Sequence, residues 1–243
     1  MWTRERLKMN GKIAFKRNYL PCVGVAFIMS IVTTLLNSGN AGGRVSQNYS
    51  YYSEGSGMTG EYLSFQVPFF GLLTGGVLIA GTIVGILLAI FVGTVIEMGG
   101  KRFFVLNKKG TPSVGVVLDG FKSGNYGNVV LTMFLRELYT ILWSLLLIVP
   151  GIIKYYEYLM VPYILAENPG MDHKEVFAIS KRMMNGQKME TFILSLSFIG
   201  WDLLSVITCG IAGIFYVAPY KEATFAELYA YSKAMAYEEG YIR

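Results

Sequence analysis

The sequence predicts an all-α integral membrane protein built as a bundle of six transmembrane helices. Composition is the first observation: 53% of the 243 residues are hydrophobic, only 15% are charged, and the mean hydropathy is +0.44. Since soluble domains have about a quarter of their residues charged, this chain lacks the charge to cover a surface that faces water. The other two observations are a series of long uncharged segments and the placement of basic residues between them.

Six segments are apolar enough to be transmembrane helices, although a charge or a proline interrupts some of them. We expect spans at residues 20–36, 70–96, 128–147, 152–165, 191–207 and 211–229. The first is near the lower length limit for crossing roughly 30 Å of hydrocarbon, and the second is long enough to tilt. Residues 20–243 are therefore expected to form a single membrane domain of three helical hairpins, preceded by a basic amphipathic segment at residues 1–19.

Lysine and arginine are concentrated on one side of the predicted spans. Nearly all of the 21 basic residues fall in four segments, at residues 1–17, 97–127, 167–190 and 221–243. The Gly- and Ser-rich segment 37–61, by contrast, has only Arg44. Cytoplasmic loops have the excess of lysine and arginine, so we expect both termini in the cytoplasm. A helical segment 1–19 either lies on the anionic inner leaflet or serves only as a positive-inside anchor.

The second predicted span has small residues four positions apart. They are Gly81, Gly85, Ala89 and Gly93. Small residues on one helical face let two backbones approach closely, and this contact drives helix association in lipid. Two interpretations stay open: a seam between copies of the chain, or tight packing inside the monomer.

The second half of the chain contains a sequence duplication. The first copy has Trp143, Pro150-Gly151-Ile152 and Pro162-Tyr163. The second copy has, in the same order, Trp201, Cys209-Gly210-Ile211 and Pro219-Tyr220. We expect each copy to be a hairpin with a glycine in its outer turn, and the two hairpins to form a parallel repeat.

At these residues the chain resembles a known family. The segments WSLLLIVPGIIKYY at 143–156, MNG at 184–186 and SFIGW at 197–201 are similar to the domain of unknown function 975 family of bacterial multi-pass membrane proteins. The resemblance implies an integral protein of the bacterial cytoplasmic membrane. It supplies no reaction and no catalytic residues.

Five charged residues fall inside or beside the predicted spans. They are Arg136, Glu137, Lys154, Glu157 and Asp202. A charge at the bilayer centre costs about 2.5–3.5 kcal/mol on insertion scales, so each needs a partner or a polar cavity. Lys154 and Glu157 are three positions apart and can pair on one helical face. Arg136 and Glu137 are adjacent, so we expect each to face a different side and to seek a partner on another span. These charges are either a site for a ligand headgroup or a proton, or ion pairs that fix the packing.

Between the fourth and fifth spans the sequence predicts a short amphipathic helix. Asp172 has the N-cap position with Glu175 three residues on, and Asn185-Gly186 is a typical helix stop. The helix either docks a partner or links two spans along the membrane surface.

No motif in the sequence indicates catalysis, and we expect no cofactor and no metal. The chain has two cysteines and the single His173, which excludes a His-based metal site and a Ser–His pair. We therefore expect a structural or accessory, partner-binding membrane component that is not an enzyme. Its partners would be membrane lipids and a second copy or another membrane protein, and no nucleic acid. The alternative is a small transporter, or an export or immunity factor, that handles an amphipathic molecule or peptide.

Overall fold

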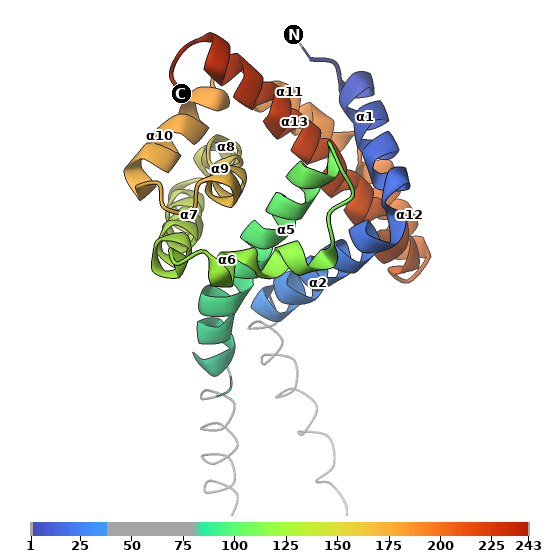
Figure 1. Cartoon of the computed structure of the whole chain (residues 1–243), viewed down its shortest axis with the longest axis horizontal. Helices are drawn as coiled ribbons and strands as arrows, with labels where there is room; N and C mark the ends of the chain where they lie inside the picture. Colours follow the sequence, from blue (N-terminus) through green and yellow to red (C-terminus); the bar gives the residue numbers. More distant parts are fainter. Residues whose placement is uncertain (1, 38–80, 82, 243) are drawn as a thin grey trace, which may run out of the picture. The chain divides into compact units, whose positions relative to one another are not determined.

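The computed structural model describes residues 2–37, 81 and 83–242, and this part of the chain is helical almost throughout (Figure 1). The chain divides into two compact units, Met1–Ile31 with Thr94–Arg243, and Val32–Gly93. The described helices agree with the predicted all-α class. The loop predicted at 37–61 lies outside the described residues, apart from Asn37 at the end of a helix.

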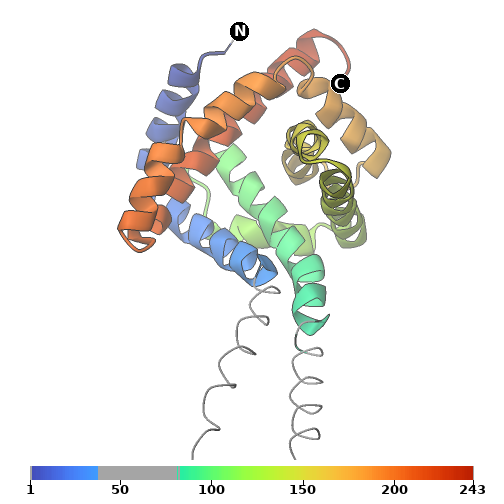
Figure 2. The same ribbon diagram turned by 180° about the vertical axis from the view of Figure 1, so that it is seen from behind.

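Most of the described helices belong to the larger unit. In chain order they are α1 (Arg4–Arg17), α2 (Tyr19–Asn37, which continues into the smaller unit), α5 (Thr94–Asn107), η3 (Val114–Leu118), α6 (Asp119–Lys122), α7 (Tyr126–Leu146), α8 (Ile148–Glu157), α9 (Val161–Glu167), α10 (His173–Met183), α11 (Lys188–Leu196), α12 (Ile199–Ile207), η4 (Gly213–Val217) and α13 (Ala218–Glu238). In this unit α5 runs between the group α7–α10 and the group formed by α1 and α12, as both views show (Figures 1 and 2). The π-helix η2 (Ala89–Gly93) belongs to the smaller unit.

The basic N-terminal segment forms a helix that packs against protein. The side chain of Thr3 caps α1 by accepting from the Arg6 N–H. The buried face of α1 lies on α13, where a Cβ added at Gly11 would be 2.7 Å from the Thr224 hydroxyl oxygen. Glycine is therefore required for this close approach. The opposite face of α1 is exposed, and the proposed contact of this face with the inner leaflet stays a prediction.

Arg17 joins the end of α1 to the end of α5. Its guanidinium donates to the carbonyl oxygens of Lys108 at 3.0 Å and Gly110 at 3.2 Å, and also to that of Asn107. A cation at a helix C-terminus satisfies carbonyl groups that have no partner within the helix. These polar contacts hold the end of α1 against the end of α5.

The two copies of the duplication share one structural feature. Pro162 and Pro219 each lie in the first turn of a helix, α9 and α13 respectively. Tyr163 and Tyr220, which follow them, are both buried.

The two hairpin turns differ, and the expectation for Gly151 is wrong. Gly151 lies inside α8, where an added Cβ would be 2.4 Å from the Ser144 hydroxyl oxygen of α7. The turn of this hairpin is at Leu147, whose backbone is extended. In the second copy Gly210 does form the turn, with a φ of +87°. The sequence match pairs the glycines, but one allows helix packing and the other allows a left-handed backbone.

Three described helices are long and apolar enough to cross a membrane: Ile83–Asn107, Tyr126–Leu146 and Lys188–Ile207. They overlap the predicted spans 70–96, 128–147 and 191–207. The first continues beyond its predicted end at residue 96, and residues 70–80 and 82 lie outside the described residues.

The remaining predicted spans correspond to shorter apolar helices or to interrupted ones. The apolar part of α2 is Tyr19–Val32. The span predicted at 152–165 is divided between α8 and α9, and the one at 211–229 begins in η4. Six spans therefore stay a prediction, whereas several helices capable of crossing a membrane are observed.

The small-residue series is only partly described. A Cβ at Gly81 or Gly85 would meet no atom of the described residues within 4 Å, so no packing partner is observed for either. Gly93 is buried, and the side chain of Ala89 lies outside the described residues. The choice between a seam and internal packing stays open.

The predicted surface helix is present as α10. Asp172 caps it by accepting from the Lys174 N–H, which confirms the predicted N-cap. Val176 and Ile179 are buried, and Gly186 beyond the helix end has a φ of +72°.

Candidate functional site

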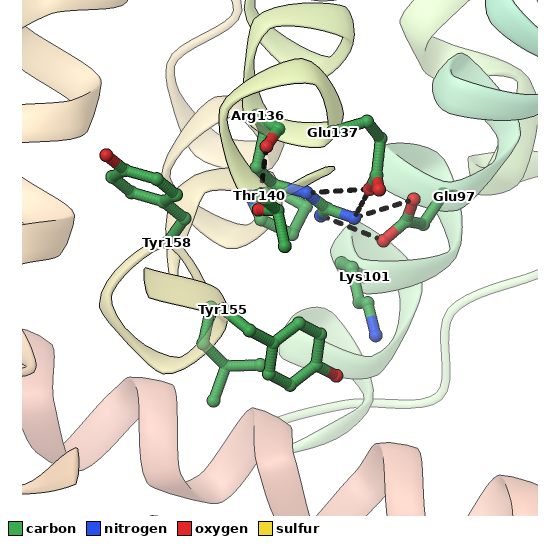
Figure 3. Close-up of a pocket in the computed structure, with 9 residues that line it drawn as sticks. Glu97, Lys101, Arg136, Glu137, Thr140, Tyr155 and Tyr158 are labelled. Atoms are coloured by element: carbon green, nitrogen blue, oxygen red, sulfur yellow. Dashed lines mark hydrogen bonds and ion pairs between the residues drawn. The ribbon is translucent and has the colours of Figure 1, made fainter. Parts of the chain in front are cut away.

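A group of charged side chains in the larger unit joins α5 and α7. Arg136 of α7 donates from Nη1 to Glu97 Oε1 at 3.0 Å and from Nη2 to Glu97 Oε2 at 3.4 Å. The same guanidinium donates from Nε to Glu137 Oε1 at 3.1 Å, and Nη2 also donates to this oxygen. Figure 3 shows Arg136 held between the two carboxylates.

The expected separation of Arg136 and Glu137 is therefore wrong. Their positions differ by one residue, but the long arginine side chain turns toward Glu97 and meets the Glu137 carboxylate on its way. Of these two residues, only Arg136 forms an ion pair with a residue on another helix. The Glu137 side chain is 50% exposed. Among the described residues, its ion pair is with Arg136 on the same helix.

A second ion pair lies one helical turn further along α5. Lys101 donates to both carboxylate oxygens of Glu222 on α13, at 2.9 and 2.8 Å. Its ammonium lies 5.3 Å from the ring centre of Tyr163 on α9. Together with Arg136 and its partners, Lys101 makes a row of alternating charges that links α7, α5 and α13.

Glu97, Lys101 and Glu222 were not predicted as site residues from the sequence. They fall in segments expected to be cytoplasmic, next to the ends of predicted spans. The available signal is the spacing of Glu97 and Lys101, four positions apart on a helix that continues from the strongest apolar segment.

A small cavity of about 70 Å³ lies beside these charges. It is lined by Glu97, Lys101, Arg136, Glu137, Thr140, Tyr155, Tyr158, Leu159 and Pro162. Tyr155 extends toward Lys101 across the cavity (Figure 3). Asp202 is not among the lining residues, so the cavity does not connect all the charges predicted to form a site.

Lys154 and Glu157 form a separate group. Lys154 donates to Glu157 Oε1 at 2.8 Å, which confirms their predicted pairing along one helix. Lys188 at the start of α11 donates to the other oxygen at 2.7 Å. The Glu157 side chain is only 5% exposed, so this carboxylate holds α8 and α11 together through two charge-assisted hydrogen bonds.

Asp202 belongs to a third group. Its Oδ2 lies 3.4 Å from Lys221 Nζ, and the side chains are 49% and 37% exposed. The five charges predicted from the sequence are thus distributed over three groups, and each group includes a residue from a basic segment or its border.

No metal-binding arrangement is found in the described part of the chain, where no three His, Cys, Asp or Glu side chains are placed to hold an ion. His173 lies 3.4 Å from Asp172 at the start of α10. The described groups can hold helices together electrostatically, and the cavity beside Arg136 has room for a few water molecules.

The described part of the chain is thus helical, has helices long and apolar enough to cross a membrane, and has the five predicted charges paired in three groups. The family model described as "Protein of unknown function (DUF975)" matches residues 145–235, which confirms over that part of the chain the family resemblance noted in the sequence. No curated protein and no solved structure matches the chain significantly.

Proposed function

We propose that this protein is a structural or accessory component of the cytoplasmic membrane that binds lipids and another membrane protein or a second copy, and that it is not an enzyme. The observation that carries the proposal is the pairing of the charges. Arg136, Lys154 and Asp202 each have a partner of opposite sign. A charge that is already paired is not free to bind a substrate, and removing its partner would destabilise the helix packing.

The alternative of a transporter needs a continuous polar path between the charges. Such a path would join Arg136 and Glu137 to Asp202, whereas the cavity beside Arg136 has a volume of only about 70 Å³ and Asp202 does not line it. The small volume of this cavity and its separation from Asp202 support the structural role over transport of an amphipathic molecule or peptide.

We also propose that both termini are cytoplasmic. The basic residues of α1 and α10 support this orientation, since Arg4, Lys12, Lys181 and Arg182 remain exposed on the helix surfaces. Exposed lysine and arginine next to the inner leaflet interact favourably with anionic lipids.

Crosslinking in native membranes, followed by purification in mild detergent, tests the proposed function. We expect a protein partner, or a second copy, in a fixed ratio to the chain. Recovery of a small amphipathic molecule or peptide in a fixed ratio, with no protein partner, would favour the transporter instead. The same experiment on the Arg136→Gln variant shows whether binding of the protein partner, or of the small molecule, depends on the row of charges.

A further inference from the structure

Two hairpins in the larger unit end in tips with a very apolar surface. In the first, every residue from Ile141 to Val149 is exposed, with Leu145 at 85% and Ile148 at 77%. The second tip, around Cys209, includes Val206 at 74% and Ile207 at 70%. These nine residues include the end of α7, the turn and the start of α8, so the tip is exposed on all sides, whereas a protein docked on one face would cover only that face.

In each hairpin a carboxylate near the tip is bonded to a lysine from a segment expected on the cytoplasmic side. Glu157, at the end of α8, pairs with Lys188 from the basic segment 167–190. Asp202 of α12 pairs with Lys221 from the basic segment 221–243. Each pair therefore indicates where the base of a hairpin lies relative to the membrane.

These charges are close to the tips, and Lys154, which pairs with Glu157, is nearer still to the first tip. At 1.5 Å per residue, Glu157 is about 15 Å from Leu147 along α8, and Asp202 is about 10 Å from Cys209 along α12. Arg136, on the other arm of the first hairpin, is about 16 Å from Leu147 by the same measure. The hydrocarbon core is about 30 Å thick, so an arm that starts near the cytoplasmic face reaches only about its middle.

The backbone of the second turn is suited to a medium without water. The N–H groups of Thr208, Cys209 and Gly210 donate to carbonyl oxygens at the end of α12, and that of Ile211 donates to the Thr208 carbonyl oxygen. The N–H of Ala212 donates to the Thr208 hydroxyl at 3.0 Å. Turns are normally excluded from the hydrocarbon because their unpaired backbone N–H and C=O groups cannot bond to water there.

The first turn also exposes few donors. The Leu147 N–H donates to the Trp143 carbonyl, and the Gly151 N–H donates to the Leu147 carbonyl. Pro150 has no N–H to satisfy.

We propose that both hairpins enter the bilayer from the cytoplasmic side and end within the hydrocarbon core, with lipid acyl chains around their tips, instead of crossing it. Lys154, Lys188 and Lys221, which are 22%, 29% and 37% exposed, then lie at the level of the headgroups, where anionic phosphates complement them. Glu137 and Asp202, both about half exposed, avoid contact with the middle of the bilayer. The inference rests on the proposed membrane location and leaves both termini on the same side.

The native cysteines permit a direct test on the full chain. Cys209 is exposed at the second tip, whereas Cys22 is fully buried and should not react in the folded protein. An environment-sensitive fluorophore on Cys209, in vesicles of phosphatidylcholine and phosphatidylglycerol, is exposed to nitroxides attached near the headgroup or near the end of an acyl chain. We expect stronger quenching by the deep nitroxide and none by aqueous iodide.

The first tip is tested by Leu147→Cys in a Cys209→Ser background, with the same expected result. Asn185→Cys in that background is the control for water, since Asn185 is exposed beyond the end of α10 and should be quenched by iodide. Stronger quenching of the tips by the shallow nitroxide or by iodide would overturn the proposal in favour of full spans. Quenching by no reagent would overturn it in favour of a covering protein.

A further control separates this inference from the membrane location itself. Phe27→Cys in the Cys209→Ser background labels an exposed position on α2, which is a span in either topology. If lipid nitroxides quench this position but not the tips, the inference fails and the membrane location stands. If they quench neither, the membrane location fails as well.

Discussion

Replacing Glu157 with glutamine tests whether the charge groups stabilise the fold. The carboxylate is 5% exposed and accepts from Lys154 at 2.8 Å and from Lys188 at 2.7 Å. Removing one partner from a fully buried pair costs about 3–5 kcal/mol. The two lysines are 22% and 29% exposed and can regain some hydration, so we expect a loss of about 2–3 kcal/mol in the free energy of unfolding.

The assay is reversible unfolding of the purified protein in mixed micelles, followed by helical circular dichroism. Glu137→Gln is the matched control because it makes the same chemical change at a side chain that is 50% exposed. An exposed ion pair contributes about 0–1 kcal/mol, so this variant should change the free energy by no more than that. Equal losses in the two variants would refute the argument that burial of the carboxylate determines its contribution.

Three further predictions follow from particular contacts. Gly11→Ala places a Cβ 2.8 Å from the Thr224 backbone nitrogen, so it should cost about 1–3 kcal/mol and make α1 more sensitive to limited proteolysis, whereas Gly24→Ala, whose nearest neighbour is 3.9 Å away, should not. Gly213→Ala brings a Cβ within 2.2 Å of the Ser205 hydroxyl oxygen, and the resulting loss of thermal stability should be relieved by adding Ser205→Ala, which would not happen if the clash were with backbone. Burial, and then the charge of Arg4, lower the pKa of Lys8 from its ordinary 10.5, so the folded state binds fewer protons there and the free energy of unfolding should rise as the pH rises through the lowered pKa toward 10.5. Lys8→Met should remove that part of the rise in a pH titration of stability, and an unchanged pH profile would contradict it.

Features that depend on neighbouring positions in the chain were predicted from the sequence. The pairing of Lys154 with Glu157 follows from their spacing on a helix, and the N-cap at Asp172 follows from its residue type. The all-helical class follows from composition and the long apolar segments. These properties are local, so no knowledge of the tertiary structure is needed.

Contacts between distant segments were not predictable in the same way. Glu97 and Arg136 meet because α5 packs against α7. A single sequence does not show which helices pack against each other. Adjacent residues on a helix project in different directions, so Arg136 and Glu137 were expected to point apart. The long arginine side chain nevertheless reaches the Glu137 carboxylate. Gly151 was misplaced because a glycine after proline fits a turn as well as a close helix contact.

The account depends most on the orientation of the chain in a membrane. Fusing the carboxyl end to a pair of reporters, one active only in the cytoplasm and one only outside it, measures this orientation directly. We predict activity of the cytoplasmic reporter alone, in the membrane fraction. Activity of the external reporter, or recovery of the fusion in the soluble fraction, would contradict the account.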